Sequence, residues 1–499
     1  MDFALPGQTM LLSMVGVLAA LVGIAWVWKL NSAMKTTPPD ILKISPKRWT
    51  DQEITDTYRR IEARSIDWKQ HLPPKLDRRY VITGGCGGVG GQMVIHLLER
   101  GQPPESIRIV DFRAPSRPDM LKGGPVSRVD FAQADITSVA AAEQAFAKPW
   151  PASVAHLPLT VFHTVALISP GQRSLWTYDK LERVNVGGTR NVLEAAERAG
   201  ASVFITTSSA SIALRPVEFW GGSPFGPWRG WWPKYFSQAI DESDFDRPLR
   251  PHAQFWSNYA HTKAVAERLV CGANRPGFRT GSVRPANGIY GSSQGDVVVG
   301  LALRAGSFPS WMPSVLQNFV HGGHVSLGHL LFEAALLRSE GAMPRCAGRP
   351  FVVTDAGPPP LFRDFYRLLE LTVRAPPIHV TYLQPGIMLV LAHVVELFDI
   401  ASSMPVLRWV VPKPRGDLAM LQPAVFTAGS HTPASDAAAQ KSVDEGGLGY
   451  RPVCTTIEGM CQQVAEWNRE HAAAAAKPQS AGETLVNDIK NVGAAPAAV

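Results

Sequence analysis

The chain of 499 residues is 45% hydrophobic and 18% charged, and its 49 basic and 42 acidic residues leave a formal net charge of +7. This length allows two domains with sizeable cores. The basic excess is small and no basic run is interleaved with aromatic residues, which argues against nucleic acid as a partner. Five cysteines without CxxC or metal-like spacing predict free thiols in a reducing compartment and no metal site.

The N-terminal segment is the first expected element, and it is apolar. Between Phe3 and Trp28 there is no charged residue, and the run Met10–Trp28 is about as long as a helix that crosses a bilayer. Basic residues follow this run, whereas Asp2 is the only charged side chain before it, so the positive-inside rule places the long C-terminal part in the cytosol. We therefore expect residues 1–35 to form a single-pass membrane anchor, in preference to a cleaved signal peptide or a buried core helix.

Residues 36–77 contain prolines and mixed charges, which predict a linker with one short helix. Beyond this segment, β and α patterns alternate. The expected strands are 78–85, 106–112, 127–135, 159–167 and 202–209, and the expected helices are 91–101, 139–147 and 185–200. Strands that alternate with helices predict a parallel sheet covered on both faces, which is a doubly wound α/β domain.

The alternation sets the expected domain boundaries. In chain order, the regions are the anchor 1–35, the linker 36–77, the α/β domain 78–300 with a Trp-rich insertion at 215–250, a smaller substrate-binding region 301–470 and a disordered, Ala-rich tail 471–499. A second apolar stretch, 386–401, contains His393 and Glu396 and is too polar for a confident span. A buried helix is favoured there over a helix in the membrane interface.

The stretch VITGGCGGVG joins the first expected strand to the first expected helix. Gly84, Gly87 and Gly90 are spaced G-x-x-G-x-x-G, and glycines in this position allow a tight turn and the approach of a pyrophosphate to the helix N-terminus. Asp111 closes the next strand, where an acid would bind ribose hydroxyls and repel a 2′-phosphate. The pattern predicts a dinucleotide site that prefers NAD, while Arg113 two residues later keeps NADP open.

Tyr259 and Lys263, in the segment NYAHTKAVAERL, lie four residues apart on one face of an expected helix. A phenol with a pKa of about 10 is a poor base at neutral pH, and an adjacent ammonium would lower that pKa toward the working range. The strand that ends in FITTSSAS would place Ser209, or as second choice Ser208, at the carboxyl edge of the sheet, where a hydroxyl can hold a substrate oxygen. With the glycine loop, these side chains predict dehydrogenation of an alcohol.

The motifs together resemble the extended short-chain dehydrogenase/reductase superfamily, and within it the 3β-hydroxysteroid dehydrogenase family, particularly sterol-4α-carboxylate 3-dehydrogenases. The resemblance covers roughly residues 78–370. It rests on TGGCGGVG, VFHTVAL, NVGGTRNVLEAA, TSSAS, YAHTKAVAE, VRPANGIYG and FVVTDAGPPPLFRDF. It implies a Rossmann domain of the extended type with NAD as cofactor and a smaller C-terminal substrate domain.

The resemblance also implies roles for individual residues. Tyr259 would be the base, Lys263 would hold the ribose and tune Tyr259, Ser209 would orient the substrate, and Asn185 would support a proton relay. Asp135 and Ile136 would flank the adenine. The full set of implied cofactor contacts is Gly84, Gly87, Gly90, Asp111, Asp135, Ile136, Ala166, Tyr259, Lys263 and Pro285.

Two features depart from the family pattern. His321, in FVHGGHVS, stands where the family usually has an acidic segment, and the Trp-rich insertion before Tyr259 is longer than expected. The insertion could cover the substrate entrance, dip into the membrane or alter the substrate.

The expected function is NAD-dependent oxidation of the 3β-hydroxyl of a sterol or steroid, with decarboxylation to follow where the substrate is a 4α-carboxysterol. The expected location is a membrane, the endoplasmic reticulum by the sterol resemblance, with the catalytic domain in the cytosol; the resemblance also allows a homodimer. Two alternatives stay open. One is a related dehydrogenase or isomerase of another steroid, terpenoid or secondary metabolite, and the other is a non-catalytic NAD-binding scaffold.

Overall fold

A seven-stranded parallel sheet lies at the centre of the computed structural model, which describes residues 6–121, 123–169, 171–291, 296–338, 342–374 and 376–475. The strand order is β10-β6-β5-β4-β1-β2-β3. The strands are β1 (Arg79–Thr83), β2 (Ile107–Asp111), β3 (Asp130–Gln133), β4 (Leu159–His163), β5 (Ala201–Thr207), β6 (Arg279–Pro285) and β10 (Pro350–Val353). The expected doubly wound α/β fold is confirmed.

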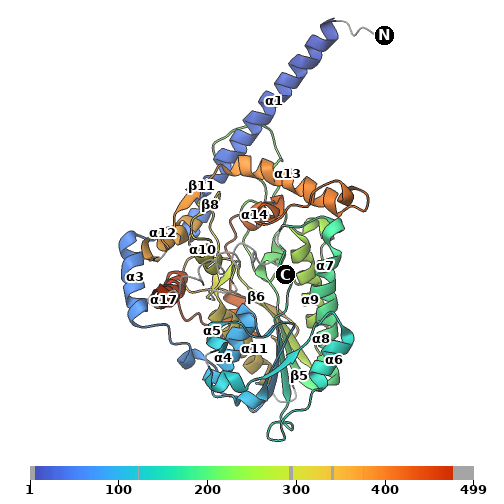
Figure 1. Ribbon diagram of the computed structural model, residues 1–499, viewed down its shortest axis with the longest axis vertical. Helices are drawn as coiled ribbons and strands as arrows, with labels where there is room; N and C mark the ends of the chain where they lie inside the picture. Colours follow the sequence, from blue (N-terminus) through green and yellow to red (C-terminus); the bar gives the residue numbers. More distant parts are fainter. Residues whose placement is uncertain are drawn as a thin grey trace, which may run out of the picture.

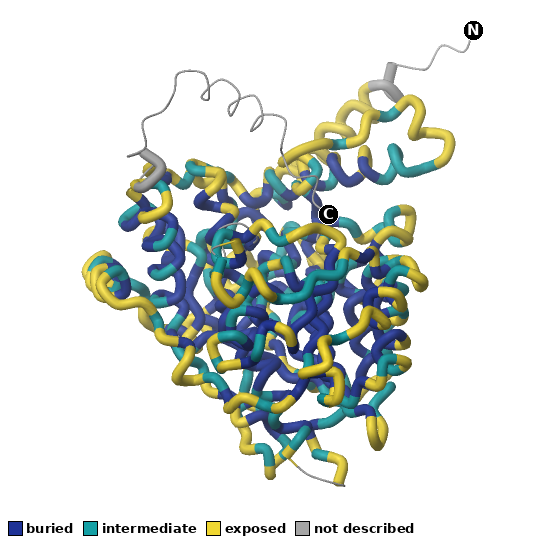
Figure 2. The backbone as a smooth tube through the Cα atoms, turned by 60° about the horizontal axis from the view of Figure 1, so that its bottom comes forward, coloured by how far each residue is buried: buried dark blue, intermediate teal, exposed yellow. Residues whose placement is uncertain are grey.

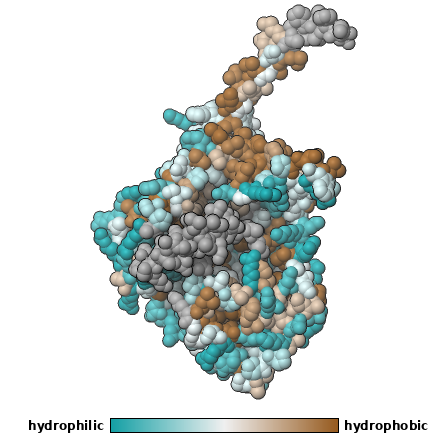
Figure 3. Space-filling model, viewed as in Figure 1, coloured by the Kyte–Doolittle hydropathy of each residue, from teal (hydrophilic) through white to brown (hydrophobic). Residues whose placement is uncertain are grey.

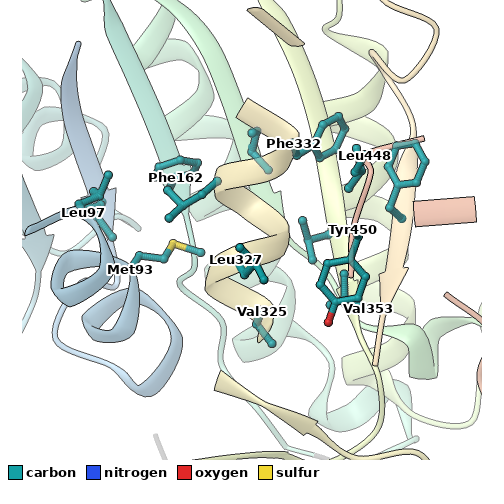
Figure 4. Packing of buried hydrophobic residues seen from close by; sticks show 14 of the residues in the cluster. Met93, Leu97, Phe162, Val325, Leu327, Phe332, Val353, Leu448 and Tyr450 are labelled. Atoms are coloured by element: carbon teal, nitrogen blue, oxygen red, sulfur yellow. The ribbon is translucent and has the colours of Figure 1, made fainter. Parts of the chain in front are cut away.

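Helices cover both faces of this sheet (Figure 1). On one face lie α4 (Gly88–Glu99) and α11 (Gly322–Leu337), and on the other α6 (Val139–Ala147), α8 (Thr189–Arg198) and α9 (Asn258–Gly272). Strands buried on both faces need near-continuous apolar runs, and β2 and β4 are fully buried along their length. Side chains of α4 and α11, among them Met93, Leu97 and Phe332, pack with Phe162 of β4 (Figure 4).

The order of the strands reverses between β1 and β4. Chain connections leave these two neighbours in opposite directions along the sheet, so the loops that follow them diverge at the carboxyl edge. Open α/β sheets bind ligands at such a switch point. The glycine loop follows β1, and the segment with Ala166 follows β4, so the fold brings two predicted cofactor contacts to this edge.

The region past residue 300 is divided between the sheet and a second layer. Its α11 and β10 belong to the sheet domain, so that domain extends beyond the expected boundary at residue 300. The second layer contains α10 (Val299–Ala305), α12 (Phe362–Thr372), α17 (Thr456–Ala475) and two short strand pairs, β7 (Ile289–Tyr290) with β9 (Val320–His321) and β8 (Phe308–Ser310) with β11 (Val380–Tyr382). Shorter helices are α5 (Pro118–Leu121), α7 (Asp179–Glu182), α14 (Asp417–Met420), α15 (Pro423–Ala428) and α16 (Ala437–Gln440).

The segment 36–77 does more than link two parts of the chain. It forms α2 (Pro39–Ile44) and α3 (Asp51–Ala63), and the apolar face of α3 is buried against α12 and α17. The tail also differs from expectation, because α17 continues through residues 471–475. Residues 476–499 lie outside the described residues.

The longest helix, α1 (Pro6–Met34), projects from the body (Figures 1 and 2). Most residues from Met10 to Ala25 are exposed, whereas Leu30 and Met34 are buried. Both α1 and α13 (Pro385–Ser403) are long and apolar enough to cross a membrane by length and composition. The exposed part of α1 measures about 25–30 Å at 1.5 Å per residue, close to the thickness of a hydrocarbon core.

The base of α1 is fastened to the Trp-rich insertion. Lys29 is buried, and its Nζ donates to the carbonyl oxygens of Ser223 at 2.7 Å and Gly226 at 3.3 Å. The same ammonium lies 4.6 Å from the ring centroid of Trp231, and Trp26 packs edge-on against that ring. The insertion therefore packs against the last turns of α1.

Candidate active site

The glycine loop folds into a tight cradle between β1 and α4. Gly84 has a φ of +76°, which favours glycine, and a Cβ at Gly90 would lie only 2.3 Å from the carbonyl oxygen of Gly84. Gly87 is the N-cap of α4 and donates its N–H to the same oxygen at 3.0 Å. The first N–H groups of α4 have no acceptor within the helix, as at any helix start. The cradle fits a pyrophosphate, because those groups and the helix dipole favour an anion.

Asp111 ends β2 beside this cradle. One carboxylate oxygen accepts from the backbone N–H of Cys86 at 3.1 Å and the other from that of Arg113 at 3.2 Å. Burial and the neighbouring Asp111 carboxylate raise the pKa of Cys86 to about 12, so this thiol stays protonated and inert. An acid held at the end of β2 fits the ribose of a dinucleotide and disfavours a 2′-phosphate there.

The other predicted cofactor contacts follow the ends of neighbouring strands. Asp135 is exposed, and its carboxylate accepts from the backbone N–H of Thr137 at 2.9 Å. Ile136 is buried, while Ala166 is half-buried in the segment after β4. Pro285 is the last residue of β6 and is buried. Since β2, β3, β4 and β6 are parallel, all of these positions lie along the carboxyl edge of one sheet.

Ser209, Tyr259 and Lys263 meet at the end of β5. Tyr259 lies in the first turn of α9, and the nearby Ser209 hydroxyl acts to lower the pKa of its phenol. Lys263 is buried and donates its Nζ to the carbonyl oxygen of Thr207 at 2.5 Å. The Ser209 hydroxyl also pairs with that of Ser211 at 2.8 Å. The second-choice residue Ser208 is buried instead, with its backbone N–H bonded to Val283.

The pKa of Tyr259 differs from the expectation drawn from the sequence. Burial raises it to about 12, although the Ser209 hydroxyl acts in the opposite direction. Burial lowers the pKa of Lys263 to about 8, with Glu267 acting in the opposite direction. The Lys263 ammonium bonds to the backbone of β5 at the Thr207 carbonyl, and desolvation is the largest influence on the pKa of the Tyr259 phenol. Without a further positive charge, the site therefore holds Tyr259 as a neutral phenol.

Asn185 lies in a π-helical turn, η5 (Arg183–Gly188), that precedes α8. Its side-chain oxygen accepts from the backbone N–H of Leu167 at 2.7 Å, and its nitrogen donates to the Leu167 carbonyl and to the Thr262 hydroxyl, both at 3.1 Å. It thereby joins the segment after β4 to the helix that carries Tyr259. Single π-turns are frequent at functional sites.

Two residues at the site, Asn258 and Arg117, make contacts that were not expected from the sequence. The backbone N–H of Asn258, next to Tyr259, donates to the carbonyl of Gln172 at 2.8 Å, and its side chain donates to that of Ser174, also at 2.8 Å. Arg117 donates to the carbonyls of Gly87 and Gly88 and so supports the cradle. In the sequence, only the position of Asn258 next to Tyr259 could have indicated a role at the site. The hydrogen-bond partners of Asn258 and Arg117 lie far from them in the chain and could not be identified from it.

The departure at His321 has a structural explanation. Its ring accepts from the backbone N–H of Gly323 at the start of α11 and stacks on Trp68, with centroids 4.9 Å apart. A carboxylate is still present, because Asp355 accepts from the backbone N–H of His321 and from the ring of His324, both at 2.7 Å. Within the described residues, no group of three or more His, Cys, Asp or Glu side chains could hold a metal ion.

The comparisons with known proteins agree with this geometry. The sequence matches the 3-beta hydroxysteroid dehydrogenase/isomerase family over residues 81–218 and 233–381, more than half of the chain. A 3 beta-hydroxysteroid dehydrogenase/Delta 5-->4-isomerase from Mycobacterium tuberculosis (strain CDC 1551 / Oshkosh) is 30% identical over 309 residues, which cover 58% of this chain and 69% of the relative. A decarboxylating sterol-4-alpha-carboxylate 3-dehydrogenase from Bos taurus is 28% identical over 318 residues, which cover 61% and 73%.

Among solved structures, a UDP-glucose-4-epimerase from Stenotrophomonas maltophila with bound NAD and formylated UDP-arabinopyranose has a TM-score of 0.50. It is 16% identical and covers 80% of this chain and 99% of its own. This likeness supports the fold.

Fold and site define a nicotinamide-dependent oxidoreductase of the extended short-chain dehydrogenase type. More closely, the chain belongs to the 3-beta hydroxysteroid dehydrogenase/isomerase family. The expected family, an enzyme rather than a scaffold, and a cofactor of the NAD(P) type are thereby confirmed. The roles of the individual residues remain predictions.

Proposed function

We propose that this protein is a membrane-anchored enzyme that oxidises the 3β-hydroxyl group of a sterol with NAD⁺. The observation that carries the proposal is the meeting of Ser209, Tyr259 and Lys263 at the end of β5, on the same sheet edge as the glycine cradle. Its family membership supports a steroid or sterol as the substrate class.

The residues divide the work of this reaction. Gly84, Gly87 and Gly90 would hold the pyrophosphate of the cofactor, and Asp111 would bind its ribose hydroxyls. When bound, NAD⁺ accepts a hydride from the carbinol carbon and brings a positive charge to the site. That charge opposes the desolvation that raises the pKa of Tyr259.

Tyr259, as phenolate, takes the proton of the substrate hydroxyl, while Ser209 holds the hydroxyl oxygen by a hydrogen bond. Lys263, on α9, would bind the cofactor ribose from the end of β5, where its ammonium donates to the Thr207 carbonyl. Asn185 keeps the segment after β4 and helix α9 in register, and it supports the passage of the proton away from Tyr259.

A 4α-carboxylated sterol is the substrate that we favour. Oxidation at the 3-position makes it a β-keto acid, which loses CO2 because the ketone accepts the electrons of the breaking bond. No additional catalytic group is then needed. An isomerase, by contrast, must move a proton between two ring carbons after the oxidation. The relatives from Bos taurus and Mycobacterium tuberculosis carry these two activities in their names.

A membrane anchor is consistent with an enzyme whose substrate is insoluble in water. Helix α1 would cross the bilayer, and the basic residues that follow its apolar run Met10–Trp28, from Lys29 to Arg48, would keep the body on the cytosolic side. A sterol would then reach the site from the membrane. We propose the endoplasmic reticulum as the location, on the basis of the substrate class.

The test uses the full chain in phospholipid vesicles with NAD⁺ and a panel of sterols. It follows NADH by absorbance and CO2 from a carboxyl-labelled 4α-carboxysterol. The proposal expects NADH from 3β-hydroxysterols and none from their 3α epimers, and it expects CO2 in step with NADH from the carboxylated substrate. NADH without CO2 would reject the decarboxylating substrate, and no NADH from any sterol would reject the substrate class.

A further inference from the structure

Helix α13 has two chemically different faces. Its outward face is apolar and exposed, formed by Ile387, Val390, Leu391, Val394, Leu397 and Phe398. Its inward face carries Glu396 and Asp399, which are both buried, together with buried apolar residues. The sequence favours a buried helix here, and the structure shows a helix buried on one side alone. A space-filling view shows the apolar surface at the base of α1, continuous with that helix (Figure 3).

The start of α13 is fixed to α1 at the level where α1 enters the body. Asn31 donates to the side chain of Gln384 at 2.9 Å and accepts from the backbone N–H of Gly386 at 3.1 Å. A Cβ at Gly386 would lie 2.8 Å from the carbonyl of Val27, so the two helices touch through their backbones. From there α13 runs across the direction of α1 (Figure 1). If α1 crosses a bilayer, α13 lies along its surface.

The segment after α13 carries the same chemical character. Val406, Trp409 and Val410 are each more than three-quarters exposed. Arg408, Lys413 and Arg415 are exposed among them, and Asp417 is the one acidic residue between positions 404 and 420. Apolar side chains with interspersed basic residues are suited to an interface with anionic lipid headgroups.

The inward face of α13 is tied to the active site. Arg173 holds Glu396 through two hydrogen bonds of 2.6 and 2.8 Å, and Gln172 donates to Asp399 at 3.4 Å. Gln172 is the residue whose carbonyl accepts from Asn258, beside Tyr259. One short segment, 171–174, therefore contacts both α13 and the start of α9.

A cavity of 360 Å³ opens at this contact. Its lining includes Arg173, Val217, Trp220, His393 and Thr427, which come from the segment 171–174, the Trp-rich insertion, α13 and α15. The residue after Thr427, Ala428, packs in the same cluster as Tyr259. The cavity thus lies between the inward face of α13 and segments that border the catalytic tyrosine.

We propose that α13 and the segment 404–415 lie in the surface of the bilayer that α1 crosses, and that α13 forms the membrane-side wall of the substrate entrance. The bilayer contact rests on the crossing of the membrane by α1 and is independent of the enzyme activity. The role in substrate entrance rests on the proposed function, because it requires a substrate dissolved in the membrane.

The first experiment tests the bilayer contact without reference to activity. Three single variants of the full chain each carry one benzoylphenylalanine. The residue replaces Leu397 on α13, Leu18 on α1 as the positive control, or Val139 on α6 as an exposed apolar control. Each variant is placed in phosphatidylcholine vesicles that contain phosphatidylserine. Irradiation should crosslink phospholipid to positions 397 and 18 and leave position 139 unlinked. Lipid at position 18 without lipid at position 397 would overturn the proposal.

The second experiment tests the entrance. Leu391→Glu/Leu397→Glu places two charges on the outward face and changes no residue of the site, with Val139→Glu as the control. We expect the KM for a vesicle-dissolved sterol to rise about tenfold, equal to about 1.4 kcal/mol, while kcat and the Kd for NADH stay unchanged. An unchanged KM would overturn the entrance role. If wild type turned over no sterol, the proposed function would fail, and the crosslinks would still decide the bilayer contact.

Discussion

The carboxyl edge of the sheet and the membrane-facing cap are built by opposite means. We use cap for the base of α1, the Trp-rich insertion and α13. At the sheet edge, a short local motif sets the geometry of the glycine loop, where a Cβ at Gly90 would lie 2.3 Å from the carbonyl oxygen of Gly84. In the cap, contacts join distant segments, such as Lys29 to Ser223 and Arg173 to Glu396. The cofactor cradle is therefore encoded by a local motif, whereas the proposed access route depends on tertiary contacts.

The largest expected effect is at the sheet edge. Tyr259→Phe removes the group that takes the proton and should lower kcat about 10²–10⁴-fold, while NADH binding stays unchanged. Tyr178→Phe is the matched control, because that phenol also bonds to α9, through His261 at 2.8 Å, yet lies outside the proposed chemistry. Steady-state kinetics on both variants measure the contrast. Equal activity of the two would break the assignment of Tyr259.

The cradle gives the next effect. Gly90→Ala would place a methyl 2.3 Å from the Gly84 carbonyl, so we expect a loss of about 1–3 kcal/mol in the free energy of unfolding. Weaker NADH binding should accompany it. Gly88→Ala is the control for stability, because a Cβ there meets no atom within 4 Å. Urea unfolding and NADH fluorescence measure both effects, and equal stability of the two variants would contradict the close approach.

The cap should lose local stability without an effect on the carboxyl edge of the sheet. Lys29→Ala removes two hydrogen bonds from a buried ammonium, and we expect a loss of about 1.5–3 kcal/mol of local stability in the insertion. Limited proteolysis should then cut within residues 221–231, while NADH binding stays as in wild type. Lys35 is exposed, so Lys35→Ala should leave the cleavage rate unchanged. A parallel loss of NADH binding in Lys29→Ala would show that the two regions are one unit.

The smallest expected effect is a shift in the pH dependence of kcat. The Ser209 hydroxyl acts to lower the pKa of Tyr259, so Ser209→Ala should raise that pKa. Because phenolate is the active form, the rising limb of kcat against pH should move to higher pH. Ser211→Ala, which removes a neighbouring hydroxyl, should move it less. An unmoved limb in Ser209→Ala would mean that the hydroxyl does not bond to the phenol during turnover.

Much of the fold and of the site's composition could be predicted from the sequence. The alternation of elements gave the sheet, and fixed spacings gave Gly84, Asp111 and Tyr259. The pKa of Tyr259 could not be predicted, because its largest cause is desolvation, which depends on packing from several elements. Nor could the anchoring of α9 by Gln172, since a hydrogen bond to a backbone carbonyl leaves no residue pattern.

The same limit applies to α13. Its composition, with Glu396 among apolar residues, favoured burial, but composition does not record which partner each face meets. The partner of Glu396 is Arg173, more than two hundred positions earlier in the chain. Because this ion pair fixes the polar face of α13 toward the body, the apolar face of the helix points outward.

The most direct test of the central claim follows one hydrogen. A 3β-hydroxysterol that carries deuterium at its 3α position is supplied to the full chain in vesicles with NAD⁺, and the cofactor is analysed by mass spectrometry. The account predicts that deuterium appears on the nicotinamide in proportion to ketone formed, and that Tyr259→Phe suppresses both together. Ketone formed with unlabelled NADH, or deuterium retained by the sterol, would contradict it.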